Sequence, residues 1–317
     1  MNYLFHYTTI SKLKIILDKQ TIMFNNIDKV NDPYEVKSID YLEVISFQKF
    51  MSEFSERMKL LSCENFKEPE NAELNEELDD WENVILEDER EYYYFILEQY
   101  NKLRKKIVKT LCFSCGISKI NDLSVQEIPN KRPGYFYPRM WAQYANTNKG
   151  CCIIFNKNKF DAIFNKLSSH YHLFAGKISY IDILSNEYKD SIMKYISGME
   201  LNLNKIITYE YLLDNIRLLF FRKDINWRDE IEYRYLIVNK NNNIDHEPYL
   251  MNIENAIDYI VMGENSKYDK TLIKNIQKKG IKIYQINNIL SKYILKNVDF
   301  KDMEYIEWMK KNSKHII

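Results

Sequence analysis

Residues 227–238 read WRDEIEYRYLIV, and this stretch decides the fold class because it holds the strongest strand pattern of the chain. β-Branched and aromatic residues dominate its second half, as is typical of strands. Its uninterrupted apolar end predicts a central rather than an edge strand. Successive side chains of a strand point to opposite faces, so one face is expected to be charged and the other to face the core. The charged face would carry Glu230, Glu232 and Arg234, and the core face Ile231, Tyr233 and Tyr235.

The two carboxylates make this strand a candidate catalytic site. Glu230 and Glu232 would repel each other on one strand face, which could raise the pKa of one of them, and Arg234 would offset that repulsion. Trp227 stands at the entrance of the strand. A solvent-exposed charge ladder on a surface strand would use the same residues, so both interpretations stay open here.

Working outward, helical and strand patterns are mixed without a regular βαβ period, which predicts a single α+β domain over 1–317 with a mixed central sheet. Residues 40–109 are expected to form a helical insertion, acidic first and then basic. The charged tail 299–317 is expected to form a peripheral helix. A threonine after the first strand, Thr8 or Thr9, is expected to cap the next helix.

The bulk composition narrows the classes of function. With 45 basic and 45 acidic residues the net charge is zero, which argues against general electrostatic capture of nucleic acid or membrane. No stretch resembles a membrane span or a signal peptide, and the five cysteines form a poor disulfide framework, so a cytoplasmic protein with free thiols is expected. Phosphate-binding glycine loops and zinc-hydrolase motifs are missing, and no metal site is predicted.

Two loops add candidates. Residues 129–138 read PNKRPGYFYP and could bind a nucleic-acid strand through cations and aromatic stacking, or form a lid or a packed loop. The residues concerned are Lys131, Arg132, Tyr135, Tyr137 and Arg139. Asn31 and Asp32 precede a proline, which favours a turn, and Glu35 could pair with Arg139 or Arg234.

Six motifs in order resemble a bacterial family known as domain of unknown function 2971. They span nearly the whole chain outside the acidic segment, but Gln143 stands where that family usually has histidine, which weakens an acid–base role at this position. The motifs are FHYTT (5–9), VNDPYE (30–35), LCFS (111–114), MWAQYANTNKGCCIIF (140–155), KDINWRDEIEYR (223–234) and YIVMG (259–263).

The order of a strand histidine, a strand ending in Phe-Ser and a later Glu-x-Glu also resembles ADP-ribosyltransferases. That resemblance implies a sheet split around a cleft and NAD as substrate. His6 would hold the ribose, Ser114 would brace the nicotinamide pocket, Glu232 would be catalytic and Glu230 would position or activate the acceptor. The full set of NAD-binding candidates is His6, Tyr7, Thr8, Ser114, Trp141, Tyr144 and Arg234.

The expected function is therefore an ADP-ribosyltransferase-like enzyme or NAD glycohydrolase, of the kind that serves as a toxin or phage-defence effector, with a protein or nucleic-acid acceptor. The alternative is a non-catalytic module that binds nucleic acid or a partner protein. A nuclease using Glu230, Glu232 and Lys223 is a third hypothesis. Each site residue also has a structural alternative: His6 as a hydrogen-bonded strand residue, and Trp141 and Tyr144 as core.

Overall fold

A computed structural model describes residues 2–29, 107–116, 125–127, 133–182, 209–214, 216–240, 247–289 and 292–298. Most of the expected helical insertion and the whole of the expected C-terminal helix lie outside these residues. The strands are β1 (Tyr3–Thr8), β2 (Thr21–Asn26), β3 (Val108–Cys115), β4 (Val125–Glu127), β5 (Cys151–Asn156), β6 (Tyr171–Lys177), β7 (Ser179–Ile181), β8 (Arg222–Asp224), β9 (Glu232–Asn239), β10 (Tyr249–Asn252), β11 (Ile257–Met262), β12 (Lys282–Ile289) and β13 (Lys292–Asn297).

The α-helices are α1 (Ile10–Lys19), α6 (Pro138–Gln143), α7 (Lys157–Asn165), α10 (Tyr209–Asp214), α11 (Ile216–Phe220) and α12 (Lys270–Lys278), and the short 3-10 helices are η1 (Ile27–Lys29), η2 (Lys166–Ser169) and η3 (Ile225–Glu230). Within the described ranges no helix is long and apolar enough to cross a membrane.

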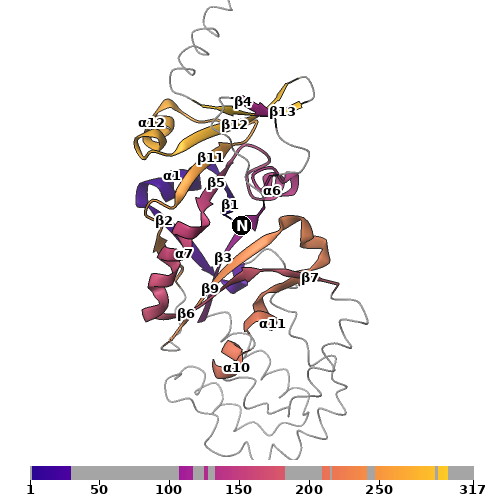
Figure 1. Cartoon of the computed structure of the whole chain (residues 1–317), viewed down its shortest axis with the longest axis vertical. Helices are drawn as coiled ribbons and strands as arrows, with labels where there is room; N and C mark the ends of the chain where they lie inside the picture. The colour runs from indigo at the N-terminus through magenta and orange to yellow at the C-terminus, as the bar shows by residue number, and fades with distance from the viewer. Residues whose placement is uncertain are drawn as a thin grey trace, which may run out of the picture.

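One large sheet organises the fold (Figure 1). Among the described residues it has eleven strands, in the order β10-β2-β3-β1-β5-β11-β12-β13-β4, with β9 paired to β3 and β6 paired to β9. The β11–β12 pair is parallel, whereas β1, β3, β5 and β9 pair antiparallel. The predicted mixed central sheet is confirmed. A separate small sheet joins β7 and β8 in parallel.

The large sheet branches at β3. One edge of β3 pairs with β9 along almost its whole length, from Val108 to Ser114. The other edge is shared, because β2 pairs at Lys109 and Thr110 whereas β1 pairs at Ser114 and Cys115. The sheet therefore divides into one arm that continues through β1 and β5 and another that continues through β2 and β10.

The space on one face of the sheet is filled by α1 and α7. Leu13, Ile16 and Leu17 recur at helical spacing on α1 and pack in the same core cluster as the α7 phenylalanines Phe160 and Phe164. The side chain of Thr9 caps α1 by accepting from the Lys12 backbone N–H at 3.2 Å, which confirms the predicted helix start. This cluster is the largest continuous core that unites both arms of the sheet.

The opposite face is covered in two places. The segment 133–145, including α6, packs its aromatic residues on β1, β5, β11 and β12. Below β9, as Figure 1 is drawn, α10 and α11 cover Leu236 and Val238. The charged start of β9 lies on this same face, because Glu232 and Arg234 alternate in phase with Leu236 and Val238.

Two boundaries differ from those that the sequence predicts. Residues 141–148 (WAQYANTN) read as a short helix, whereas α6 runs from Pro138 to Gln143, since proline suits the first turn of a helix. After it, Asn146, Thr147 and Asn148 all take left-handed backbone angles, so the chain turns before β5. β3 begins at Val108, inside the segment that was expected to be helical.

Candidate functional site

The approach to β9 places two carboxylates together by an unexpected route. Glu230 was expected on the strand but is the last residue of the 3-10 helix η3. Ile231 then takes a left-handed conformation, with φ 45° and ψ 52°, and its side chain is 39% exposed rather than in the core. This reversal, and not strand alternation, brings the buried side chains of Glu230 and Glu232 to the same side.

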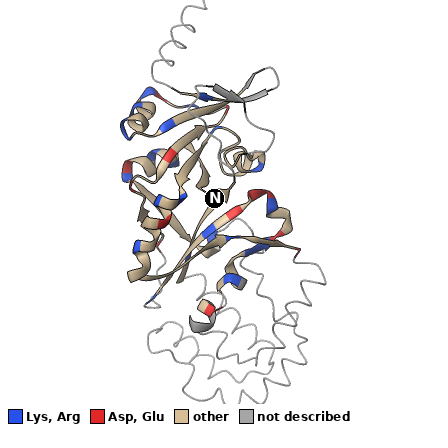
Figure 2. Cartoon of the chain, viewed as in Figure 1, with Lys and Arg blue, Asp and Glu red and all other residues tan. Residues whose placement is uncertain are grey.

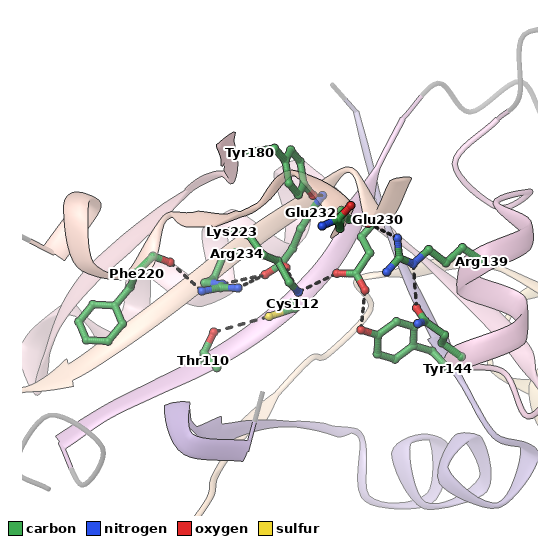
Figure 3. A network of polar contacts seen from close by, with 12 residues as sticks. Thr110, Cys112, Arg139, Tyr144, Tyr180, Phe220, Lys223, Glu230, Glu232 and Arg234 are labelled. Carbon is green, nitrogen blue, oxygen red and sulfur yellow. Dashed lines mark hydrogen bonds and ion pairs between the residues drawn. The ribbon is translucent and has the colours of Figure 1, made fainter. Parts of the chain in front are cut away.

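Three side chains join these carboxylates into a continuous set of contacts. The five residues, here called the charge network, are Tyr144, Lys223, Glu230, Glu232 and Arg234 (Figure 3). The Lys223 ammonium donates to Glu230 Oε2 at 2.8 Å and to Glu232 Oε2 at 3.3 Å. The Tyr144 hydroxyl, from the end of α6, donates to Glu230 Oε1 at 2.7 Å. The network thus ties α6 to β8, η3 and β9.

Arg234 holds Glu232 from the other side. Its Nε donates to Glu232 Oε1 at 2.7 Å, its Nη2 lies 2.6 Å from the same oxygen, and its Nη1 donates to the Phe220 carbonyl at 2.7 Å. Burial would raise the pKa of Glu232, but the positive charges of Arg234 and Lys223 and a hydrogen bond from Cys112 outweigh it and lower the pKa to about 2. Glu232 is therefore an anion at neutral pH.

The four charges of the network are almost completely buried. Lys223, Glu230, Glu232 and Arg234 are each 5% exposed or less, and two cations balance two anions. Figure 2 shows acidic and basic residues close together along η3 and the start of β9. Buried ions must be compensated in this way, because an unpaired charge in the interior costs several kcal/mol. The alternative of a solvent-exposed charge ladder is therefore wrong for this strand.

Trp227 connects the network to the surface. The ammonium of Lys223 lies 4.8 Å from the centre of its ring, and the guanidinium of Arg139 lies 4.7 Å from it. Arg139 also donates to the Asn226 carbonyl and, at 3.3 Å, to Gln143. Trp227, Arg139 and Tyr144 are all partly exposed, so this side of the network borders solvent.

Ser114 stands directly beside Glu232. The two residues are paired across β3 and β9, so their side chains share a face of the sheet. Ser114 is 1% exposed, and its hydroxyl oxygen has no hydrogen-bond partner among the described residues. Buried hydroxyls without a partner are uncommon in proteins, which makes this one a candidate for binding a ligand.

His6 lies across the sheet from Glu232. Phe5 pairs with Ser114, so it is Phe5 that shares the face of Glu232, whereas His6 points to the core of α1 and α7. The His6 ring packs edge-on against Phe113, and its Nδ1 lies 3.4 Å from the Cys112 carbonyl. Burial lowers the pKa of His6 to about 4, so the ring is neutral at pH 7.

Tyr7 and Thr8 are structural. The Tyr7 hydroxyl donates to the Gly134 carbonyl at 2.8 Å and accepts from the Tyr137 backbone N–H at 3.1 Å. Thr8 is buried, and its carbonyl packs so closely on Gly150 that a β-carbon there would lie 2.2 Å from it. The expectation that these two residues contact NAD finds no support in their positions.

Three aromatic candidates belong to the core. Trp141 is 2% exposed and donates from its indole to the Tyr135 carbonyl at 3.0 Å. Tyr135 is fully buried, and Tyr137 is buried with its hydroxyl donating to the Cys115 carbonyl at 3.1 Å. None of these rings is free to stack on a base or on nicotinamide, so the packed-loop alternative holds for residues 133–137.

Five predicted residues lie outside the part of the chain that the structure describes: Asn31, Asp32, Glu35, Lys131 and Arg132. Within the described part, no three His, Cys, Asp or Glu side chains gather as a metal site would require. Among the described residues, Cys112, Cys115, Cys151 and Cys152 are not joined in disulfides.

Sequence reasoning gave Lys223 a role only in the nuclease hypothesis and missed Tyr180 and Phe220. The Tyr180 hydroxyl accepts from the Glu232 backbone N–H at 2.7 Å, and the Phe220 backbone carbonyl accepts from Arg234 at 2.7 Å. A backbone carbonyl leaves no signal in the residue type, so Phe220 could not have been found. The sequence does give one indication for Lys223, because this residue opens the motif KDINWRDEIEYR (223–234), seven residues before Glu230.

Comparison with known proteins gives one match. No curated protein and no solved structure matches the chain. A family match covers residues 140–235, from α6 into β9, which is less than a third of the chain and includes every side chain of the charge network. The family whose sequence model matches this segment is the one described as a protein of unknown function, DUF2971.

Proposed function

We propose that the protein cleaves the nicotinamide–ribose bond of NAD and transfers the ADP-ribose unit to an acceptor or to water. The observation that carries the proposal is the pairing of an anionic Glu232 with the unpartnered, buried hydroxyl of Ser114 on the neighbouring strand. Further support comes from the pairing of β3 with β9, because it sets Ser114 and Glu232 side by side on one face of the sheet.

The reaction suits an anion held in this way. When the bond between C1′ and the nicotinamide nitrogen breaks, the electron pair stays on nicotinamide, which leaves as a neutral molecule. The ribose becomes an oxocarbenium-like cation, as in glycoside cleavage. A buried carboxylate that is already fixed in place stabilises such a cation without reorganisation. Glu232 would do this and bind a ribose hydroxyl, while Glu230 would receive the proton that the attacking hydroxyl loses.

The proposal gives His6 no contact with the ligand, unlike the expectation from the sequence. Its ring lies on the other face of β3 and reaches Glu232 only through Cys112, whose carbonyl it approaches and whose thiol bonds to Glu232. The proposal therefore rests on Glu232, Ser114 and the partly exposed border formed by Tyr144, Trp227 and Arg139, and assigns no ribose contact to His6.

The test is release of nicotinamide from NAD, measured by chromatography for the wild type and three variants. Glu232→Gln should lose at least about 100-fold in rate, because the carboxylate that stabilises the cationic transition state is removed. Ser114→Ala should lose about 10-fold while its thermal unfolding midpoint stays unchanged, since the hydroxyl has no partner to lose. Tyr135→Phe is the matched control, because it removes another buried, unpartnered hydroxyl away from Glu232 and should react like the wild type.

NAD binding by equilibrium dialysis supplies a measurement that needs no acceptor. A wild type that neither binds NAD nor releases nicotinamide, with protein, nucleic-acid and small-molecule acceptors supplied, refutes the proposal. So does a Ser114→Ala variant with full activity together with an equally active Glu232→Gln variant, because the charge network would then be purely structural.

A further inference from the structure

The charge network contains a cation-binding position that the chain fills itself. Two carboxylates whose side chains converge form, by charge alone, a receptor for an ammonium or guanidinium group. In this protein the position between Glu230 and Glu232 is taken by the Lys223 ammonium, 2.8 Å from one carboxylate and 3.3 Å from the other. The three side chains are 3–4% exposed, so the contact is buried.

Every carboxylate oxygen of this receptor already accepts from a donor (Figure 3). Both Oε2 atoms accept from Lys223, Glu232 Oε1 accepts from Arg234, and Glu230 Oε1 accepts from Tyr144. The ring of Trp227 covers the ammonium at 4.8 Å. A cationic ligand would have to displace a buried lysine and would leave its charge uncompensated, which costs several kcal/mol.

A neutral hydroxyl meets no such barrier. Tyr144 is partly exposed, and its phenol donates a neutral O–H to Glu230 at 2.7 Å. Water or an alcohol can take over that hydrogen bond without changing the charge balance of the network, since one neutral donor replaces another. Tyr144 thus marks the side from which a neutral nucleophile can approach Glu230.

We infer that Lys223 determines acceptor specificity by filling the cation position, so that the site uses a neutral oxygen nucleophile and excludes guanidinium and ammonium acceptors. The inference rests on the proposed function. In the step concerned, the C1′–nitrogen bond breaks with its electron pair going to nicotinamide, the oxygen of water or of an alcohol bonds to C1′, and its proton passes to Glu230 and then to solvent.

The first experiment measures the cation position without NAD. Lys223→Ala is titrated with ethylammonium and ethylguanidinium chloride and, as a neutral probe, ethanol, and thermal unfolding is followed. Both cations should raise the midpoint of this variant by about 3 °C relative to equal sodium chloride, whereas ethanol and the wild type should show no such rise. Lys157→Ala is the matched control, because Lys157 also pairs with a carboxylate and lies 5.0 Å from a tyrosine ring, but in a more exposed place.

A rise of the same size in the wild type overturns the inference, because the cation position would then be open. So does a folded Lys223→Ala variant that gains nothing from either cation. If Lys223→Ala does not fold, Lys223→Ser, which leaves the same space between the two carboxylates, is tested for cation binding by the same titration, and the same two outcomes overturn the inference.

The second experiment uses wild-type protein, NAD and the guanidinium compound agmatine, with products separated by mass. Free ADP-ribose without an agmatine adduct is expected, and Lys223→Ala should form the adduct at least about 10-fold more than the wild type. An adduct as the main wild-type product overturns the inference but leaves the proposed function standing. If no protein cleaves NAD, the proposed function fails, and the titration still decides whether Lys223 fills a cation position.

Discussion

Ile231 carries a backbone conformation that β-branched residues rarely adopt. Its φ of 45° lies in the left-handed region, where the β-carbon crowds the following carbonyl at a cost of about 1–2 kcal/mol. The conformation persists because its neighbours hold it: the Ile231 carbonyl accepts from the Cys115 N–H at 2.8 Å, and its N–H donates to Arg228 at 3.2 Å. Strain of this kind tends to collect at functional sites.

Replacement of Ile231 by asparagine should stabilise the protein by about 1 kcal/mol, since asparagine tolerates left-handed angles and little packing is lost from an exposed side chain. Urea unfolding measures the change. Ile225→Asn is the matched control, because Ile225 is similarly exposed at 37% but lies within η3. An Ile231→Asn variant that is less stable than the control would show that the side chain, and not the backbone, matters.

At this scale the sequence predicted the right residues for the wrong reason. Glu230, Glu232 and Arg234 do meet, as strand alternation suggested, but Glu230 gets there through the turn at Ile231. Isoleucine is a poor residue for left-handed angles, so no propensity argument could have placed a turn inside a run that otherwise reads as strand. The contact with Cys115 that holds the turn comes from a residue more than 100 positions away.

Among the elements, β1 and the segment before α6 depend on a single phenol. The Tyr7 hydroxyl serves two buried backbone groups of that segment, the Gly134 carbonyl and the Tyr137 N–H. Gly134 itself fits only because it has no side chain, since a β-carbon would lie 2.2 Å from the ring of Phe5. The position of α6, and with it Tyr144, therefore follows from contacts made on β1.

Tyr7→Phe should destabilise the protein by about 1–3 kcal/mol, because it leaves two buried backbone groups without their partner. Tyr135→Phe removes a phenol that is equally buried but has no partner among the described residues, so it should be neutral or slightly stabilising. Chemical denaturation of both variants gives the comparison. Equal losses of stability would mean that the Tyr7 hydrogen bonds contribute nothing beyond ring packing.

Elements with a clear apolar period were predictable, and those set by distant contacts were not. The spacing of Leu13, Ile16 and Leu17 gave α1, and the apolar run after Glu232 gave β9. The start of α6 and the left-handed turn after it depend on contacts with other segments. One of these is the hydrogen bond that the Asn148 carbonyl accepts from the Asn265 N–H. Local sequence carries no record of such contacts.

For the whole molecule, Glu232 and His6 make stability depend on pH in two adjoining windows. The pKa of Glu232 falls from 4.5 to about 2, so the folded state favours its anion. Its contribution is complete above pH 4.5 and is lost as the pH falls toward 2, with a magnitude of about 3 kcal/mol. The pKa of His6 falls from 6.5 to about 4, so its contribution is complete above pH 6.5 and is lost as the pH falls toward 4.

Urea unfolding between pH 2 and 8 should therefore show His6→Gln flattening the slope between pH 6.5 and 4, and Glu232→Gln flattening it between pH 4.5 and 2. Glu254→Gln is the control, because this carboxylate is 53% exposed and should leave both windows unchanged. Wild-type stability that is constant from pH 7 to 4 would contradict the expected behaviour of His6.

At the same scale, a mixed α+β fold with a central β9 was predictable from the pattern of strands and helices, and β9 does pair on both edges, with β3 and with β6. The face that each candidate occupies was not predictable. A shift of one residue in pairing moves a side chain to the other face, and nothing in FHYTT fixes that register. This is why His6 and Glu232 were expected together.

The branching at β3 also determines when β1 and β2 can pair during synthesis of the chain. Neither β1 nor β2 has its β3 partner until the ribosome has made β3, which begins about 100 residues after β1 ends, since Phe5 pairs with Ser114 and Asn25 pairs with Thr110. Such distant pairings slow folding, because the entropy of closing a long connection is lost before the strand contacts can stabilise the structure. The entropy of closing that connection rises only with the logarithm of its length, so inserting or deleting residues between β2 and β3 should change the stability of the sheet little.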